Sequence, residues 1–286
     1  MLTRGLLNSV VSCTNAAVIS TAAVIMLVGA LSCAAQVDNA DISIGRAFER
    51  TSFSDDEIKD GFFKIAFRAE LQFGQPAGAI RKFDGPVRIF VVNRGAPDRR
   101  AELAKIVADI RAHVDHLDLA VTDDRQAANF FVTLLRRRDL ARTIRSYYGT
   151  HKARDIERAL KPECLSGIGK DSSFRILRAE ALLPVDTGDF AFYDCAYEEL
   201  LQGLGVINDD DSVPWTMFND DVQMGFFDVY DQYLVNILYD PRLRAGMTPD
   251  QVRALLPEIL PTVRAWVANP HPRRDAPEKN NAPGDQ

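Results

Sequence analysis

The chain has 286 residues, of which 47% are hydrophobic and 26% are charged, and its formal net charge is -6. This composition is typical of a globular protein that buries at least one substantial core, and it excludes disorder for most of the chain. The negative net charge makes nucleic acid and other polyanions poor partners, so we expect no nucleic-acid binding.

The first 35 residues have the layout of a secretion signal. Arg4 precedes an apolar run from Ala16 to Leu31, and small residues follow at Cys33, Ala34 and Ala35. Cleavage after Ala35 would give a soluble periplasmic protein, acylation of Cys33 would give a lipoprotein, and retention of the run would give a membrane anchor near the lower length limit for a span. In each case we expect the protein to work in the periplasm or cell envelope.

The cysteines fit this location. Two of the four, Cys13 and Cys33, lie in the signal region, which leaves Cys164 and Cys195 in the rest of the chain. Two thiols in an oxidising compartment most simply form one disulfide, and closing a loop of about 30 residues would stabilise the fold by roughly 3 to 4 kcal/mol. A catalytic thiol is the alternative, although no histidine is close in sequence to either cysteine.

A polar lead at residues 36–52 is followed by the first predicted helix. Ser54 is the expected N-cap, Glu57 completes a capping box with it, and Phe53 and Ile58 form a hydrophobic staple. Apolar residues then recur at helical spacing, which gives this helix one buried face.

Strands and helices then alternate along the chain. Residues 86–92 and 128–135 are apolar runs typical of buried strands, and a helical pattern occupies residues 99–116 between them. Residues 173–183 form a third candidate strand before a helix that starts near Phe190. This order predicts an α/β or mixed α+β fold in which helices back one sheet.

The C-terminal third is predicted to be helical. An apolar stripe at residues 226–238 stops before Pro241. Thr248 is the expected N-cap of a further helix, which Pro257 and Pro261 should break into segments. Residues 268–286 are polar and Pro-rich, so we expect a disordered tail after a single domain at residues 53–267.

One segment carries a pattern with chemical meaning. The order E-E-x-x-Q-x-L-G-x-x-N is formed by Glu198, Glu199, Gln202, Leu204, Gly205 and Asn208. It resembles the long zinc-peptidase signature H-E-x-x-H-x-x-G-x-x-H. In that signature two histidines on one helical face bind zinc, the glutamate is the general base, and the glycine lets the chain turn back to supply a third ligand.

The resemblance implies a role for each matching position. Glu199 matches the general base, Glu198 and Gln202 stand where the helix histidines belong, and Asn208 takes the third-ligand position after Gly205. None of these three ligand positions holds a histidine, and an amide oxygen is a weak ligand for zinc. The resemblance therefore implies a degenerate site, with neither metal nor cofactor.

A second resemblance covers most of the chain from Phe53 to Trp266. The residues that carry it are 86–88 (PVR), Cys195, 198–205 (EELLQGLG), 218–220 (FND), 238–242 (LYDPR) and 246–248 (GMT). The chain is similar to an uncharacterised bacterial family, domain of unknown function 2927, whose members are often exported. In addition, residues 215–218 (WTMF) resemble the methionine turn beneath zinc-peptidase sites, and together these likenesses imply a zincin-like single domain.

Three interpretations of Glu198, Glu199 and Gln202 stay open. They could form a partly buried polar cluster that holds the helix against neighbouring loops. They could line a ligand-binding cleft retained from a peptidase-like ancestor. Finally, Glu199 could support hydrolysis as general acid or base if burial raises its pKa.

Two smaller groups are candidate metal sites. Asn208 and the three aspartates at residues 209–211 could offer oxygen ligands to calcium, or form a solvated acidic turn. His113 and His116 lie three apart on a predicted helix with Asp115 nearby, and could bind a metal or simply be exposed.

A basic and aromatic group follows the second buried strand. Tyr147 and Tyr148 come after five arginines, namely Arg136, Arg137, Arg138, Arg142 and Arg145. This combination could bind an anionic glycan or a phospholipid head group. The alternative is a solvated exit from the strand.

The sequence thus predicts an exported envelope protein with a binding or interaction role. Its ligand, a peptide, glycan or protein, would occupy the cleft around Glu198, Glu199, Gln202 and Asn208, and its amino terminus would provide any membrane attachment. The alternative function is a hydrolase that acts on peptide or cell-wall polymer with Glu199 as general acid or base.

Overall fold

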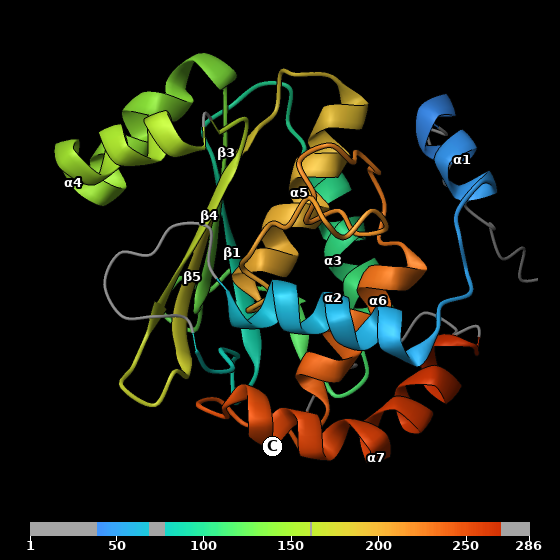
Figure 1. The fold of residues 1–286 in the computed structure, drawn as a ribbon. Helices are drawn as coiled ribbons and strands as arrows, with labels where there is room; N and C mark the ends of the chain where they lie inside the picture. The colour runs from blue at the N-terminus through green and yellow to red at the C-terminus, as the bar shows by residue number, and fades with distance from the viewer. Residues whose placement is uncertain (1–38, 69–77, 161, 270–286) are drawn as a thin grey trace, which may run out of the picture. The chain divides into compact units, whose positions relative to one another are not determined.

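The computed structural model describes residues 39–68, 78–160 and 162–269 (Figure 1). The predicted signal at residues 1–35 and nearly all of the predicted tail lie outside the described residues. None of the helices within the described ranges is long and apolar enough to cross a membrane.

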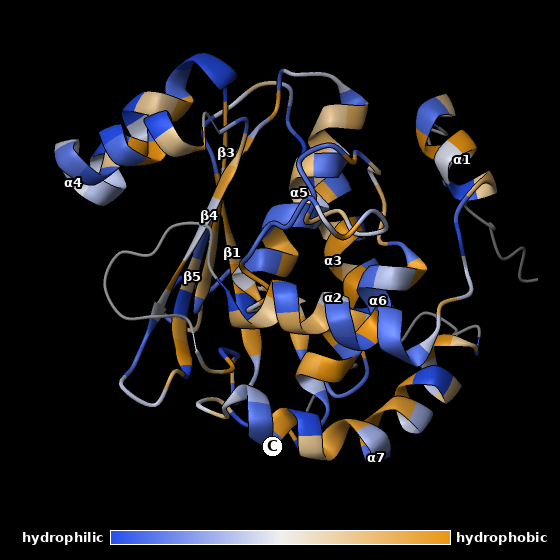
Figure 2. Ribbon diagram, in the orientation of Figure 1, coloured by the Kyte–Doolittle hydropathy of each residue, from blue (hydrophilic) through white to orange (hydrophobic). Residues whose placement is uncertain are grey.

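A five-stranded sheet forms the centre of the fold, with the strand order β2-β1-β3-β5-β4. Four strands are parallel, and β4 runs antiparallel to β5 at one edge. The apolar runs predicted as buried strands become β1 and β3, and hydrophobic colouring predominates along the sheet in Figure 2. The strands are β1 Val87–Asn93, β2 Leu119–Val121, β3 Phe130–Leu135, β4 Leu165–Lys170 and β5 Ile176–Pro184.

Seven α-helices accompany this sheet in the described ranges, and the predicted mixed α+β fold class is confirmed. They are α1 Ala40–Ala47, α2 Asp55–Phe67, α3 Arg100–His113, α4 Leu140–Ala159, α5 Asp189–Gly203, α6 Val229–Tyr239 and α7 Pro249–Val267. A short 3-10 turn, Arg137–Asp139, precedes α4.

The two capping boxes predicted from the sequence are both present. Ser54 and Glu57 exchange side-chain and backbone hydrogen bonds at the start of α2, and Thr248 and Gln251 do so at the start of α7. These bonds satisfy backbone N–H groups of the first turn that have no partner within the helix. Local sequence therefore determines where these two helices begin.

Alternation along the strands divides the core between the two faces of the sheet. Phe130, Val132 and Leu134 of β3 belong to the main hydrophobic core. The next residue, Leu135, points to the opposite face and joins a smaller cluster with Leu182 of β5 and with apolar residues of α4. Figure 1 shows α4 on one side of the sheet and α3 and α5 on the other.

Three local predictions differ from the structure. The helix expected to break at Pro257 and Pro261 is continuous as α7, because both prolines are exposed while Leu256 and Leu260 beside them are buried in the core. From Arg137 to Arg145 the arginines that follow β3 are exposed, which agrees with a solvated exit from the strand, but they lie in the 3-10 turn and α4, two elements that the sequence did not predict. In addition, α1 forms within the segment predicted as a polar lead.

The described residues of the main core all lie after the predicted signal. The buried residues of this core lie between Phe53 and Val263. A chain that begins at Gln36 therefore contains every described core residue, and we expect it to fold without the segment before it.

Candidate functional site

The helix α5 carries the peptidase-like pattern and packs directly on the sheet. At Gly203 an added Cβ would lie 2.4 Å from the Phe130 ring, so only glycine allows this close approach to β3. After α5 ends, Gly205 takes a left-handed backbone conformation with φ +126, and a Cβ there would lie 2.1 Å from the Arg81 carbonyl oxygen. This glycine ends the helix and lets the chain turn back, as the pattern predicts.

A cavity of about 470 Å³ lies beside α5. Its walls come from α5, from residues 162–168 at and before β4, from α4 on both sides of Gly149, and from the segment between α5 and α6. This volume is in the range of small-molecule and peptide side-chain sites. The cavity therefore has the size of a ligand site and is built from four separate parts of the chain.

The side chains around this cavity have one sign of charge. Six carboxylates line it, and no lysine, arginine or histidine is among the described lining residues. The six are Glu163, Asp194, Glu198, Glu199, Asp209 and Asp220. A concave surface with this composition creates a negative potential that attracts cations.

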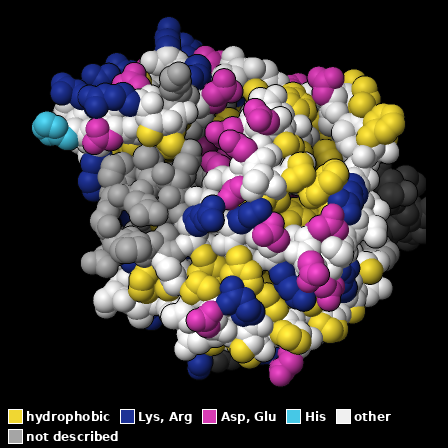
Figure 3. Space-filling model, viewed as in Figure 1, with side chains coloured by type: hydrophobic (Ala, Val, Ile, Leu, Met, Phe, Trp, Pro, Cys, Tyr) yellow, Lys and Arg dark blue, Asp and Glu magenta, His cyan; other side chains and the backbone are white. Residues whose placement is uncertain are grey.

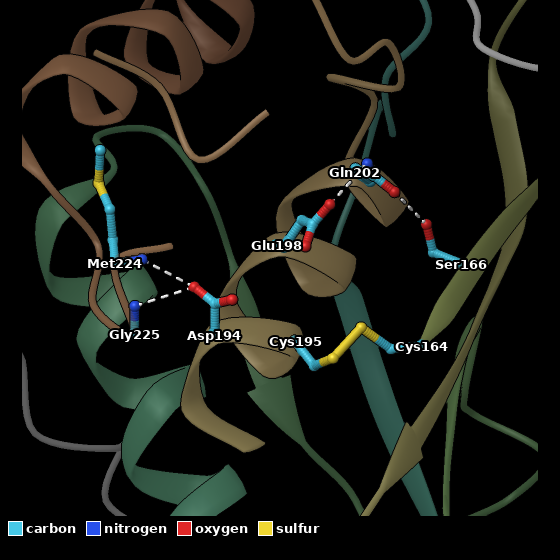
Figure 4. Close-up of a disulfide and its surroundings, with 8 residues drawn as sticks. All are labelled: Cys164, Ser166, Asp194, Cys195, Glu198, Gln202, Met224 and Gly225. Carbon is cyan, nitrogen blue, oxygen red and sulfur yellow. Dashed lines mark hydrogen bonds between the residues drawn. A yellow bond between two sulfur atoms is a disulfide. The ribbon is translucent and has the colours of Figure 1, made fainter. Parts of the chain in front are cut away.

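Glu198 and Gln202 form the polar centre of the cavity wall (Figure 4). The Gln202 amide donates to Asp209 Oδ1 at 2.9 Å and to Glu198 Oε1 at 3.5 Å, and its oxygen accepts from the Ser166 hydroxyl at 3.0 Å. Burial, with the nearby Glu199 and Asp209 charges, raises the pKa of Glu198 well above its usual range. Gln202 thus connects α5 to β4 and to the loop after α5.

Glu199 lines the same cavity and is only 5% exposed. Tyr148 of α4 lies on this wall as well. Burial, together with the nearby charges of Glu180 and Glu199, raises the pKa of the Tyr148 hydroxyl above its usual value. The tyrosine is therefore a neutral hydrogen-bonding group at neutral pH.

The predicted disulfide between Cys164 and Cys195 is confirmed, with the two Cα atoms 5.9 Å apart. It joins the residue before β4 to α5, and both cysteines line the cavity (Figure 4). The two facing walls are thus covalently linked, and the distance between them is fixed at this end.

The segment between α5 and α6 forms another wall of the cavity. Asp194 of α5 accepts backbone hydrogen bonds from Met224 and Gly225, at 2.8 and 3.1 Å. Met217 is buried and lines the cavity, and its backbone N–H donates to the buried Asp231 at 2.8 Å. These bonds fix the path of the segment over the cavity.

The structure brings three of the four predicted cleft residues together. Glu198, Glu199 and Gln202 line the cavity, whereas Asn208 is absent from its lining. The Asn208 amide instead donates to the carbonyl oxygens of Lys64 and Asp209, which turns it towards α2. Its neighbour Asp209 takes the place on the cavity wall.

Several lining residues were missed by the sequence interpretation. Asp194 lies one helical turn before Glu198, so helix periodicity could have indicated it. In contrast, Ser166, Asp220 and Tyr148 come from other elements and approach α5 only in the folded chain. No sequence signal places these three beside α5, although Tyr148 and Asp220 belong to groups that the sequence singles out for other reasons.

The other predicted metal groups do not converge. His113 is the last residue of α3, while His116 follows the helix with a positive φ of 58, so the two histidines do not share a helical face. Asn208 and Asp209 make separate contacts, and Asp210 binds Arg68 at 3.1 Å. Within the described ranges, no three His, Cys, Asp or Glu side chains form a metal-binding group.

Comparison with known proteins gives one result. No curated protein and no solved structure matches the chain. The model of one family, described as "Protein of unknown function (DUF2927)", matches residues 55–258, which include all five described strands and the whole of α5. Because this match spans more than half of the sequence, the chain belongs to the DUF2927 family.

Proposed function

We propose that this protein is a binding protein of the cell envelope that holds an extended peptide against β4, with basic side chains of the peptide in the acidic cavity. The position of β4 carries the proposal. It is the edge strand of the sheet, and residues 164–168 also line the cavity. Within the described ranges only β5 pairs with β4. An edge strand offers backbone N–H and C=O groups to which an extended peptide can add as a further strand.

The charge of the cavity supports a cationic ligand. Six carboxylates surround it without a basic side chain in the described lining, and mutual repulsion contributes to the raised pKa of Glu198. A lysine or arginine side chain would relieve this repulsion and form charge-assisted hydrogen bonds. Binding would therefore favour the ionised form of Glu198.

The residue types at the peptidase-like positions support binding over metal-dependent hydrolysis. Glu198, Gln202 and Asn208 stand where the related signature has histidines, and Met217 lines the cavity as the methionine-turn likeness implies. An amide is a poor ligand for a catalytic transition metal. In our proposal the zincin-like arrangement is thus kept as a binding cleft after loss of its metal ligands.

Two changes in a probe peptide test the two parts of the site. The probe is a labelled synthetic peptide of alternating threonine and lysine, and binding is measured by fluorescence anisotropy. Replacing its lysines with glutamate should abolish binding, because the cavity then repels the ligand. Methylating alternate backbone nitrogens keeps the charge but removes hydrogen bonds to β4, and should weaken binding by about tenfold or more.

Variants of the protein locate the binding. Glu198→Gln combined with Asp220→Asn should weaken binding of the lysine peptide by about tenfold, because two cavity charges are lost. Asp250→Asn is the control, since Asp250 is exposed on α7. Equal binding of the lysine and glutamate peptides, or an equal loss in both variants, would contradict the proposal.

Hydrolysis is the second candidate, and one observation favours it. Glu198 and Glu199 are adjacent on the cavity wall, and a carboxyl with a raised pKa such as Glu198 can serve as a general acid. The hydrolase and binding interpretations predict different effects of Glu199→Gln on turnover. The hydrolase interpretation predicts that the wild type cleaves a peptide or cell-wall polymer and that this variant does not. The binding interpretation predicts no turnover in either protein.

Export is part of the proposal, and the disulfide and the N-terminal apolar run support it. Mass spectrometry of the protein from cells distinguishes the three forms. A first residue Gln36 means a cleaved protein, an acylated Cys33 means a lipoprotein, and a chain that starts at Met1 means a retained anchor. Recovery of the reduced protein from the cytoplasm alone would contradict export.

A further inference from the structure

One side of the helix α4 faces solvent and does not line the cavity. A positive φ of 77 at Gly149 divides the helix into two segments. Leu140 and Ile144 of the first segment and Ala153 and Ile156 of the second are buried in the small cluster against the sheet. The opposite sides of both segments are exposed to solvent.

Basic residues repeat on these exposed sides at helical spacing. Arg142 and Arg145 lie three apart on one face of the first segment, and Arg138 lies in the 3-10 turn that leads directly into it. His151, Arg154 and Arg158 share a face of the second segment through the spacing i, i+3, i+7. All six are exposed, and Figure 3 shows Lys and Arg side chains gathered over α4. We refer to these six residues as the basic surface of α4.

The charge of this surface stands out against the rest of the chain. Residues 136–160 contain eight Lys or Arg and three Asp or Glu, in a protein whose net charge is -6. Arg142 pairs with Asp139, the last residue of the 3-10 turn, and Arg158 pairs with Asp155 of α4. No ion pair forms at Arg138, Arg145 or Arg154 within the described part of the chain. Most of the positive charge is therefore available to a partner.

We propose that the basic surface of α4 binds an anionic phospholipid membrane. The cations are spread over two exposed helix faces and do not converge on a pocket, which fits a flat, charged partner better than a small anion. Lys and Arg near such a surface are attracted by its negative potential within roughly 10 Å. A flat membrane touches this side only, whereas a flexible polyanion would also meet the acidic remainder of the protein.

Vesicle binding tests the proposal on a chain that begins at Gln36, so that the apolar N-terminal run cannot contribute. Sedimentation with vesicles containing about 30% phosphatidylglycerol in phosphatidylcholine should give at least about tenfold tighter binding than phosphatidylcholine alone. Raising the salt from about 0.05 M to about 0.5 M should abolish the difference, because exposed charges are screened.

A matched pair of variants distinguishes binding through the basic surface of α4 from attraction by the net charge of the protein. Arg138→Gln, Arg145→Gln and Arg154→Gln together should reduce binding to the anionic vesicles by at least about tenfold. The control replaces three exposed cations outside α4, Lys105, Arg244 and Arg253, with Gln and should change binding less than about twofold. Circular dichroism of both triple variants checks that they are folded.

Three results would overturn the proposal. The first is an equal loss of binding in both triple variants, which would mean that net charge alone is responsible. The second is competition by millimolar inorganic phosphate or glycerol phosphate, because a discrete anion site would then be the target. The third is tight binding of soluble polyphosphate without binding of vesicles, which would identify a polyanion as the partner.

Discussion

Glu198 is buried beside other carboxylates, which raises its pKa. Its contribution to the free energy of unfolding therefore depends on pH. A carboxyl whose pKa is raised on folding favours the folded state below its unfolded pKa and loses that contribution as the pH rises through the folded pKa. We therefore expect Glu198→Gln to raise the free energy of unfolding at about pH 8 by on the order of 1 kcal/mol. At about pH 4 wild type and variant should be nearly equal.

Urea denaturation at both pH values measures this effect. The replacement keeps an oxygen that can accept the hydrogen bond from Gln202, so the comparison isolates the charge. Glu258→Gln, at an exposed position on α7, is the control and should change the free energy of unfolding little at either pH. A gain for Glu198→Gln that is the same at both pH values would show that packing, and not ionisation, is responsible.

The start of α6 depends on a buried carboxyl, which links one residue to the stability of a whole element. Asp228 is the N-cap, and its Oδ1 accepts from the backbone of Tyr230 and Asp231. Burial and the nearby Asp231 charge raise the pKa of Asp228 well above its usual range.

Two substitutions at Asp228 separate capping from charge. Asp228→Ala should lower the free energy of unfolding by about 1 kcal/mol at about pH 4, because the cap is lost. Asp228→Asn keeps the acceptor oxygen and should match the wild type at low pH. As the pH rises, only the wild type has to ionise the buried carboxyl, so Asp228→Asn should become the more stable protein. Thermal melts over a pH series measure both effects.

The disulfide stabilises the contact between β4 and α5. Its cysteines are 31 residues apart, so replacing both with Ala should lower the free energy of unfolding by about 3 to 4 kcal/mol. A reductant should destabilise the wild type to the same extent and leave the variant unchanged, as followed by urea unfolding. Peptide binding should also weaken in the variant, because the two cavity walls are no longer linked. An effect of reductant on the variant would mean that it acts elsewhere.

Elements with strong local signals could be predicted from the sequence. The capping boxes at Ser54 and Thr248 and the apolar run of β3 each determine an element without help from distant residues. The strand β4 could not be predicted, because its sequence LSGIGK has two glycines and little apolar alternation. The helix α4 was missed as well, since it is rich in charge and interrupted at Gly149. Both form because neighbouring elements supply their packing.

At the scale of the whole molecule, the described core does not require the N-terminal segment. We expect a chain that begins at Gln36 to unfold in one cooperative transition, with a midpoint close to that of the full-length protein. Differential scanning calorimetry of the two proteins provides the comparison. A clearly lower midpoint for the shorter chain would show that residues before Gln36 contribute to its stability.

The candidate site could be predicted only as far as one helix. Glu198, Glu199 and Gln202 follow from a single pattern on α5, because helix geometry fixes their relative positions. The remaining wall needs the tertiary fold, since Ser166 and Asp220 come from segments on either side of α5 in the sequence. Asn208 shows the limit of the pattern, because a neighbouring carbonyl of α2 draws its side chain away.

The two sides of α4 have a thermodynamic consequence. Tyr148, Ile156 and Leu160 form part of the cavity wall, while the arginines on the opposite side face solvent. If a bound peptide alters the tilt of the two segments about Gly149, it changes the affinity of the arginines for the membrane. By thermodynamic linkage, a bound membrane then changes the affinity of the cavity for the peptide by the same factor. Titrating vesicles with and without a saturating peptide would give that factor directly, and a factor of one would mean that the sides act independently.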